Sequence, residues 1–310
     1  MLTIHFAPLQ GCTDHVYRRI HHELIGGVDA YYTPFLRLEK DGIRNRDLRD
    51  VLPANNEGLP VIPQVIASNR DELCHLSDTL QNDGYRQINI NMGCSFPLQT
   101  RLGRGAGVLN NPDRVQELME VVQSRPEVSY SVKMRLGMDS AEEGLSVLPL
   151  LNEAPLVHVA IHARLGRMQF RGEPDRAAFA QFAEHCTHPV IYNGDVTSPD
   201  DIRTLEQDFP TLHGVMVGRG LLARPTLGVE YANGKEYTEQ ERIAHTLKMH
   251  DALFEYVRAT LQGGAQQLSR LQAFWEYQEP ALPRKIYKKL MKAGSLITYD
   301  EAIGELRSFC

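Results

Sequence analysis

The sequence is poor in cysteine, and the few cysteines that it has are scattered. Its 310 residues include five, at positions 12, 74, 94, 186 and 310. No two of them form a Cys-x-x-Cys pair, and none has the spacing of zinc ligands. An odd number of dispersed thiols is typical of proteins kept in a reducing compartment. We therefore expect free thiols and no metal site.

Long hydrophobic runs and an excess of positive charge are also missing. No apolar stretch approaches the roughly 20 residues that span a bilayer. Residues 1–6 are too short and too polar for a signal peptide. The formal net charge is -6, so a polyanionic partner would need a local basic patch. These absences predict a cytoplasmic protein without membrane contact.

Short apolar runs alternate with amphipathic stretches up to about residue 225. The expected strands are 3–7, 30–33, 61–66, 87–91, 130–135, 157–162, 190–193 and 214–217. The expected helices are 13–24, 70–82, 112–124, 140–153, 175–186 and 198–208. Eight strands with interleaved helices predict an α/β fold, a (β/α)8 TIM barrel, with a doubly wound open sheet as the alternative.

Two other regions depart from this alternation. Residues 35–60 are rich in charge, Asn, Gly and Pro, and predict a long loop over the active-site end. Near residue 235 the strands stop: Thr238 and Glu241 have the spacing of a capping box, and three or four helices follow. We therefore expect a catalytic barrel at 1–234 and a small C-terminal helical domain at 235–310.

Polar or glycine-rich residues end seven of the expected strands. In a barrel, strand ends and the loops after them form the active site. The residues are Gln10, Gly11, Gln64, Asn91, Cys94, Lys133, Arg135, His162, Arg164, Asn193, Gly194, Asp195, Gly218, Arg219 and Gly220. Their distribution predicts one site at one end of the barrel. Within it, Cys94 is either a reactive thiol or a small residue that fits the turn after Gly93.

The loops after the seventh and eighth strands have the character of a phosphate site. Asn193-Gly194-Asp195 and Gly218-Arg219-Gly220 offer glycines and backbone N–H groups at the position where many barrels bind phosphate.

Two further cations lie on the fifth strand. Lys133 and Arg135 are two residues apart, so both face the same side. Apolar neighbours predict that this side is the barrel mouth, where the cations need an anionic partner. Either a ligand or a carboxylate such as Asp195 would serve. With the two loops, they predict a phosphate-bearing ligand.

Taken together, these motifs resemble those of the tRNA-dihydrouridine synthases, flavin enzymes that reduce uridine in tRNA. The matching segments are residues 7–11, Gln64, and residues 91–94, 103–109, 131–137, 162–164, 193–195 and 217–220. The resemblance covers the whole barrel and, less specifically, the helical tail. It implies reduction of the uridine C5–C6 bond in tRNA, with FMN as cofactor and NADPH as electron donor. We expect the enzyme to be a monomer.

The resemblance also implies roles for single residues. Cys94 would donate the proton. The cofactor-binding residues would be Pro8, Leu9, Gln64, Lys133, His162, Asn193, Gly194, Asp195, Gly218 and Arg219. The substrate-binding residues would be Asn91, Arg135, Arg164 and Phe170. Five basic residues of the tail form either an RNA-binding face or an ordinary solvated helix face: Arg284, Lys285, Lys288, Lys289 and Lys292.

The chain departs from the family pattern directly after Cys94. Ser95 and Pro97 stand where the family usually has Pro and Lys, and Gln272 occupies a commonly basic position of the tail. Flavin-facing residues are thus kept while RNA-facing residues change. Two alternatives stay open: an FMN oxidoreductase acting on a small molecule such as a free pyrimidine or an enoate, and a non-catalytic RNA-binding relative.

Overall fold

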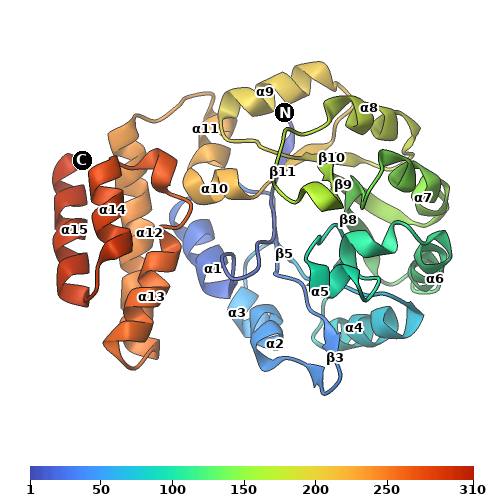
Figure 1. Cartoon of the computed structure of the whole chain (residues 1–310), viewed down its shortest axis with the longest axis horizontal. Helices are drawn as coiled ribbons and strands as arrows, with labels where there is room; N and C mark the ends of the chain where they lie inside the picture. The colour runs from blue at the N-terminus through green and yellow to red at the C-terminus, as the bar shows by residue number, and fades with distance from the viewer.

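Parallel strands form a ring in the computed structural model, which describes residues 1–310 (Figure 1). They are β1 (Thr3–Phe6), β2 (Ala30–Tyr32), β5 (Val61–Ile62), β6 (Gln64–Val65), β7 (Gln87–Met92), β8 (Ser129–Gly137), β9 (Leu156–Leu165), β10 (Val190–Asn193) and β11 (Gly214–Val217). Their spatial order is β5-β2-β1-β11-β10-β9-β8-β7-β6. The expected strands are all present, with β8 and β9 extended by two or three residues toward their loops.

The ring closes through Pro63. β5 and β6 are the two halves of one strand: β5 pairs with β2, and β6 pairs with β7. Pro63 has no N–H and separates the halves, but its carbonyl still accepts a hydrogen bond of 2.9 Å from the Asn89 N–H. The nine named strands are therefore the eight of a (β/α)8 barrel, and the alternative of an open sheet is wrong.

The expected helices cover the outside of the ring. They are α1 (His15–Leu24), α4 (Arg70–Asn82), α6 (Pro112–Gln123), α7 (Ala141–Glu153), α8 (Arg176–His185) and α9 (Pro199–Asp208), followed by α10 (Arg219–Ala223) and α11 (Leu227–Asn233). Side-chain caps fix several starts. Asn69, Asn111 and Ser198 each accept a hydrogen bond from a backbone N–H in the first turn of the helix that follows.

The segment 35–60 is more ordered than predicted. It contains a short hairpin, β3 (Leu38–Glu39) with β4 (Gly42–Ile43), and two helices, α2 (Asn45–Val51) and α3 (Pro53–Asn56). The loop prediction was wrong because polar contacts, not an apolar stripe, hold these helices. The buried guanidinium of Arg18 donates to the Asp50 carbonyl at 2.7 Å and to Asn56 Oδ1 at 2.9 Å.

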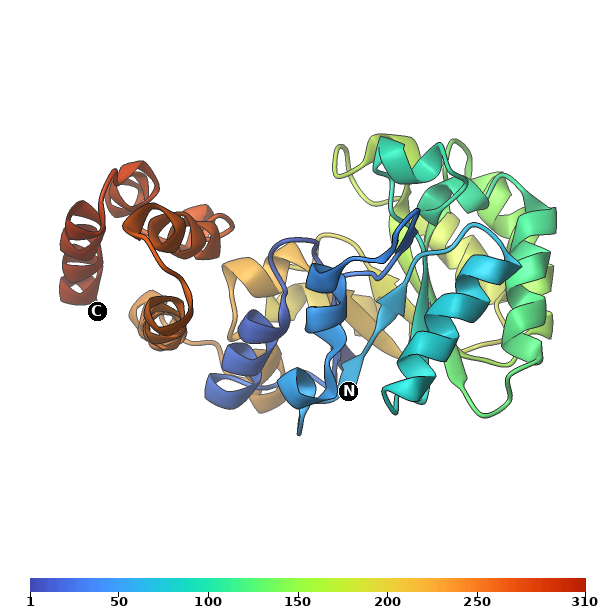
Figure 2. The same cartoon turned by 90° about the horizontal axis from the view of Figure 1, so that it is seen from below.

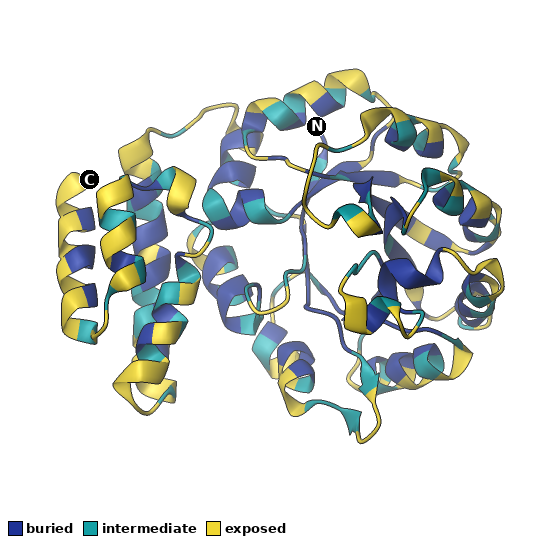
Figure 3. Ribbon diagram, in the orientation of Figure 1, coloured by how far each residue is buried: buried dark blue, intermediate teal, exposed yellow.

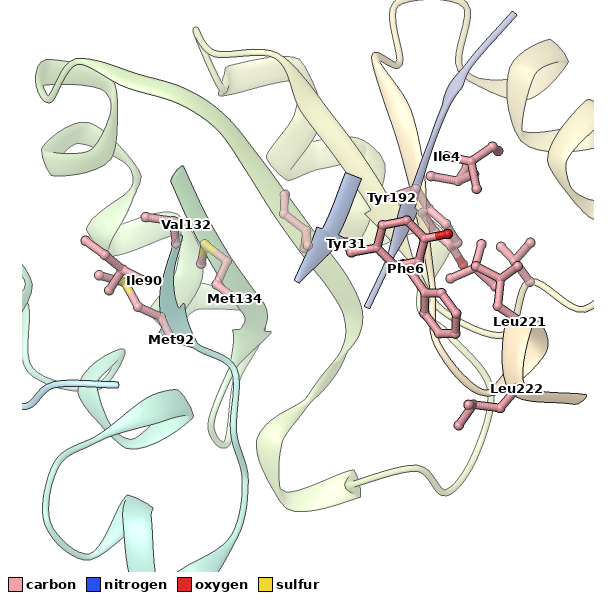
Figure 4. Packing of buried hydrophobic residues seen from close by; sticks show 14 of the residues in the cluster. Ile4, Phe6, Tyr31, Ile90, Met92, Val132, Met134, Tyr192, Leu221 and Leu222 are labelled. Carbon is pink, nitrogen blue, oxygen red and sulfur yellow. The ribbon is translucent and has the colours of Figure 1, made fainter. Parts of the chain in front are cut away.

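Side chains alternate along the strands and separate an apolar layer from a polar one. Ile90 and Met92 of β7 pack with Val132 and Met134 of β8 on the helix side (Figure 4). The residues between them face the barrel interior, because successive strand residues point to opposite faces. Figure 3 shows the same division in the helices, whose buried faces turn toward the strands.

The tail contains four helices and no strand, as expected. They are α12 (Glu239–Thr260), α13 (Gly264–Phe274), α14 (Arg284–Lys292) and α15 (Leu296–Phe309), with a 3-10 turn η3 (Glu279–Ala281). The predicted capping box starts α12: the Thr238 N–H donates to Glu241 Oε2 at 2.7 Å, and the Glu241 N–H donates to Thr238 Oγ1 at 3.2 Å. Trp275, fully buried, donates to the Tyr299 hydroxyl at 2.7 Å.

Figure 2 shows the tail as a group of helices beside the barrel. The predicted boundary at residue 234 falls between α11 and α12, and the division into two domains stays a prediction. All five cysteines are free thiols. No helix combines the length and the apolar character that a bilayer crossing requires. No group of His, Cys, Asp or Glu side chains is arranged to hold a metal ion.

Candidate active site

A cavity of about 1000 Å³ opens at the carboxyl ends of the strands. The residues to which the resemblance assigns a role all line it except Arg164, which lies behind its wall; of the other strand-end residues, Gly11 also lies outside its lining. The lining residues are Pro8, Leu9, Gln64, Asn91, Cys94, Lys133, Arg135, His162, Phe170, Asn193, Gly194, Asp195, Gly218 and Arg219. The fold therefore brings together residues that are spread over more than two hundred positions of the sequence.

A chain of amide side chains crosses the barrel interior beneath Cys94. Asn91 Nδ2 donates to Gln64 Oε1 at 2.7 Å, and Gln64 Nε2 donates to Asn89 Oδ1 at 2.6 Å. Asn89 in turn donates to Ser131 Oγ at 2.8 Å. Because each amide is held from both ends, the orientation of Gln64 and Asn91 is fixed before any ligand binds.

The loop that carries Cys94 is held from below and from the side. Asn91 Oδ1 accepts hydrogen bonds from the N–H groups of Gly93 at 3.0 Å and Cys94 at 2.8 Å. The Ala106 N–H donates to the Cys94 carbonyl at 2.9 Å. Gly105 has φ +60°, and a Cβ there would lie 2.5 Å from the Cys94 carbonyl oxygen. Gly105 thus permits close packing against the backbone of Cys94.

The half-buried thiol of Cys94 favours its protonated form. Burial raises the pKa of Cys94, and the Phe96 N–H and the positive charges of Arg135 and Lys133 oppose this only partly. No other cysteine and no carboxylate lines the cavity beside it except Asp195, which is engaged by arginines. The arrangement suits a proton donor better than a thiolate nucleophile.

Lys133 is a cation without a carboxylate partner. Its Nζ donates to Asn193 Oδ1 at 2.9 Å, and Asn193 Nδ2 donates to the Met216 carbonyl at 2.6 Å. Burial, together with repulsion by Arg135, lowers the pKa of Lys133 to about 7. The alternative in which Asp195 neutralises this cation is wrong. An electron-rich ligand edge would relieve the destabilised charge.

Arg135 joins two loops of the cavity wall. Its Nε donates to the Gly93 carbonyl at 2.9 Å, while its Nη1 donates to the carbonyls of Leu165 at 3.0 Å and Gln169 at 2.7 Å. Burial and the nearby Arg164 lower the pKa of Arg135 to about 10, so it stays charged at neutral pH. Its Nη2 group has no partner in the protein and is available to an acceptor in the cavity.

Arg164 supports the wall instead of lining the cavity. Its side chain is 1% exposed and forms an ion pair with Asp195, which also binds Arg219 Nη2 at 2.8 Å. The guanidinium of Arg219 lies over the Phe170 ring, 4.7 Å from its centroid. The predicted substrate contact by Arg164 would require it to leave this carboxylate. A positioning role fits the geometry better.

His162 is neutral and buried between these cations. Burial, followed by the charges of Arg135 and Lys133, holds the pKa of His162 well below its usual range. Its Nε2 lies 3.3 Å from Arg164 Nη1. A neutral imidazole here can accept one hydrogen bond and donate another without adding charge to the site.

The two glycine loops form part of the cavity wall. A Cβ at Gly218 would meet Leu9 Cδ1 at 3.1 Å, and Gly194 and Asp195 both have positive φ, 149° and 44°. Gly220 has another role: a Cβ there would lie 2.0 Å from the Val196 carbonyl oxygen, so it permits close packing of α10.

Sequence comparison identifies the family of this arrangement. Residues 5–298 match the profile of dihydrouridine synthase (Dus). The chain belongs to the dihydrouridine synthase family.

Three relatives named as tRNA-dihydrouridine synthases show how similar the sequence is to other members of the family. A tRNA-dihydrouridine(16) synthase of Pseudomonas putida is 26% identical over 247 residues, which is 76% of each chain. A tRNA-dihydrouridine synthase B of Pasteurella multocida is 26% identical, covering 72% of this chain and 67% of its own. A probable tRNA-dihydrouridine synthase of Rhodobacter capsulatus is 30% identical, covering 71% and 67% respectively.

Solved structures share the barrel. Morphinone reductase superposes with a TM-score of 0.53 at 11% identity, over 76% of this chain and 87% of its own. The old yellow enzyme of Trypanosoma cruzi also has a TM-score of 0.53, at 10% identity, over 76% and 89%. At such low identities these structures support the fold alone.

As a member of the family the chain is a flavin-dependent oxidoreductase, and the cavity fits a flavin. Its floor contains the buried, uncharged side chains of Ala7 and Met216, on which a flat ring can lie. Lys133 also lines the cavity and has no anionic partner in the protein, so it can interact with an electron-rich edge of such a ring. The loops at Gly194 and Gly218 line the cavity as well.

Several lining residues were not predicted from the sequence. Phe35 comes from the segment that was predicted as loop, and Phe96 directly follows Ser95. Tyr277 and Pro280 belong to the tail, so the tail completes the cavity wall. Only Phe96 carried a signal, because it lies within the departure from the family pattern.

Proposed function

We propose that this protein reduces the C5–C6 double bond of uridine in tRNA to dihydrouridine, with FMN as cofactor. The observation that carries the proposal is a protonated thiol, Cys94, fixed in the same cavity as Lys133, which has no carboxylate partner, and the two glycine loops. Bound FMN would supply the hydride. The relatives named as tRNA-dihydrouridine synthases support the same reaction.

The chain's own task is then to hold the cofactor and to deliver a proton. Lys133 would meet the electron-rich edge of the flavin, and Gly194, Gly218 and Arg219 would bind its phosphate. Saturating the C5–C6 bond also needs a proton at the carbon that does not receive the hydride. Cys94 would donate it, because burial keeps the thiol protonated at neutral pH.

Residues around the thiol would orient the uracil. The free Nη2 of Arg135 can donate to a uracil carbonyl, and Phe170 presents an aromatic face that is held by Arg219. Asn91 uses its Oδ1 and one N–H within the protein, which leaves one N–H for the base. Arg164 would act through Asp195 and not by touching the substrate.

The helical tail would bind the body of the tRNA. Pro280 lines the cavity, and α14 begins four residues later with Arg284. Of the five basic residues of α14, all exposed, only Lys289 forms an ion pair, with Glu305. Free cations beside the cavity entrance suit a phosphate backbone. NADPH as electron donor, a monomeric state and a cytoplasmic location complete the proposal.

Substitution of Cys94 tests the reaction. Cys94→Ala should retain bound flavin and flavin reduction by NADPH, but dihydrouridine formation should fall by about 10²–10⁴-fold, as for other removed acids. Cys186→Ala is the control, since this thiol lies outside the cavity. Dihydrouridine would be mapped in tRNA from a deletion strain that expresses each variant. Wild-type dihydrouridine levels with Cys94→Ala would exclude the proposed proton donor.

The same assay separates the alternatives. Turnover of a free pyrimidine or an enoate without RNA, and no dihydrouridine in tRNA, would identify a small-molecule reductase. RNA binding without any flavin reoxidation would identify a non-catalytic relative. The pH profile adds a check on the acid. Because burial raises the pKa of Cys94, activity should persist through neutral pH and fall only as the pH passes the raised pKa.

A further inference from the structure

An exposed apolar surface adjoins the catalytic cavity. Phe96, Leu98 and Leu102 are 57%, 61% and 59% exposed, and all three lie within seven residues of one another. Phe96 also lines the cavity, two residues after Cys94. We refer to these three side chains as the Phe96 patch. Such a concentration of solvent-exposed apolar side chains beside a site is typical of a binding surface.

The patch is a rigid feature. The Phe96 carbonyl accepts hydrogen bonds from the N–H groups of Gln99 at 2.8 Å and Thr100 at 3.1 Å, which close the short helix α5 (Pro97–Thr100). A Cβ at Gly107 would lie 2.5 Å from the Thr100 carbonyl oxygen, so the end of α5 packs tightly on the chain behind it. The exposed side chains are therefore presented by a fixed backbone.

Arg135 connects the patch to a second exposed aromatic residue. Its guanidinium bonds the carbonyl of Gly93, before Cys94, and the carbonyl of Gln169, before Phe170. Phe170 is 55% exposed and lines the same cavity. Two aromatic rings thus stand at the entrance on two loops that a single side chain holds together.

The surroundings of the patch are positively charged. Arg101 is the C-cap residue of α5, and Arg167 and Arg171 lie on the loop that carries Phe170. All three are exposed, and none of their guanidinium groups has a hydrogen-bond or ion-pair partner in the protein. The loop of Phe170 contacts the 3-10 turn that follows α5 (Gly105–Val108), since a Cβ at Gly166 would lie 3.1 Å from the Ala106 Cβ. Aromatic rings among free cations are the features that bind unpaired nucleotides.

We propose that the Phe96 patch is a stacking platform for the unpaired nucleotide adjacent to the target uridine. The inference rests on the proposed function. A uridine that reaches Cys94 must leave its stack, which exposes the face of the neighbouring base. Phe96 stands at the cavity entrance, where that base must lie. Stacking on Phe96 replaces the base–base stacking that is broken, while Arg101 faces the phosphates.

Removal of the aromatic ring should weaken tRNA binding without slowing the chemistry. With flavin-loaded enzyme and unmodified tRNA from a deletion strain, Phe96→Ala should raise KM and Kd about tenfold, a typical loss for one stacked base. The kcat should stay within about twofold. Phe96→Leu should be intermediate. Phe309→Ala, which removes an exposed ring from the far end of the tail, is the matched control and should change neither constant.

A fluorescent variant reports stacking directly. Phe96→Trp introduces an indole that tRNA should quench, and the one native tryptophan, Trp275, is fully buried and should not respond. Stacking adds no phosphate contact, so the loss in Phe96→Ala should be equal at low and high salt. An unchanged Kd together with an unquenched indole would overturn the platform. So would a loss that disappears at high salt.

These outcomes are distinct from failure of the proposed function. If the platform is wrong, Phe96→Ala still forms dihydrouridine with the KM of the wild-type protein. If the proposed reaction is wrong, the wild-type protein itself forms none. Binding of a protein partner to the patch, unaffected by tRNA, would also overturn the inference.

Discussion

The ion pair between Arg164 and Asp195 gives a sharp test of how the cavity wall is held. Arg164 is almost completely buried, and Asp195 supplies its only carboxylate. Apart from Asp195, the Arg164 guanidinium contacts only neutral groups, the Gly172 carbonyl at 2.6 Å and His162 Nε2 at 3.3 Å, and its Nε has no partner, so no other anion balances its charge. Replacing Asp195 with Asn removes the charge but keeps one acceptor oxygen. Asn also tolerates the positive φ of 44° at this position, so the backbone need not change.

The expected loss of stability follows from how far the side chains of Arg164 and Asp195 are exposed. Removing one partner of a buried ion pair costs about 3–5 kcal/mol. Asp195 is 39% exposed, so water partly screens the pair and the lower part of the scale applies. We expect Asp195→Asn to lower the free energy of unfolding by about 2 kcal/mol. The pair between Arg176 and Asp208 is 48% and 50% exposed, so Asp208→Asn should cost less than about 0.5 kcal/mol.

Urea unfolding followed by far-UV circular dichroism measures both variants, since Trp275 would report only on the tail. Burial alone would raise the pKa of Asp195, but Arg164 and Arg219 together outweigh it and lower the pKa. A lowered pKa contributes stability at neutral pH that is lost as the pH falls through it. The difference between wild type and Asp195→Asn should therefore be complete at pH 7 and shrink below about pH 4. Equal losses for the two variants would refute this reasoning.

Three other predictions concern the cofactor, the thiol loop and the tail. Lys133 has a pKa of about 7 in the free protein. A ligand that prefers the charged form of Lys133 should raise this pKa. Flavin affinity should therefore fall between about pH 6 and about pH 8, and flavin binding should take up protons, which calorimetry in two buffers measures. Lys133→Met should abolish both effects. In thermal unfolding, Gly105→Ala should destabilise the protein by roughly 2 kcal/mol or more, because Gly105 has a positive φ and lies close to Cys94. The control is Gly304→Ala in α15, where a Cβ would meet nothing within 4 Å, and it should be neutral or stabilising by up to about 1 kcal/mol. Lys288→Ala with Lys292→Ala should weaken tRNA binding and reduce the slope of log K against log salt by about 0.9 for each phosphate that is no longer neutralised; an unchanged slope would show that α14 is an ordinary solvated face.

Much of the barrel could be predicted from the sequence because its signals are local. An alternation of apolar and polar residues defines β7, and a short apolar run defines β10. Capping residues such as Asn69 and Ser198 mark where helices begin. The short helices α2 and α3 could not be predicted in this way. They are held by Arg18, a buried side chain more than thirty residues earlier, so no local pattern announces them.

The residues of the candidate site also fall into those that could be predicted from the sequence and those that could not. Strand-end residues such as Lys133 and Asn193 follow from the position of each strand, because parallel strands end at one face. Tyr277 could not be placed, since its entry into the cavity depends on how the tail docks. The environment of Arg164 was also out of reach. Whether it lines the cavity or pairs with Asp195 depends on the backbone conformation of the loop after β10.

The contribution of Tyr277 and Pro280 to the cavity wall has a consequence for the evolution of the protein. A tail that only bound RNA could be exchanged between relatives as an independent cassette. Here a recombinant that received a foreign tail would inherit an incomplete cavity, and it would also break the ion pair between Asp14 before α1 and Arg270 in α13. The contacting residues of barrel and tail must therefore coevolve. A tail grafted from another family member should give an active enzyme only when the residues on both sides of this contact are transferred together.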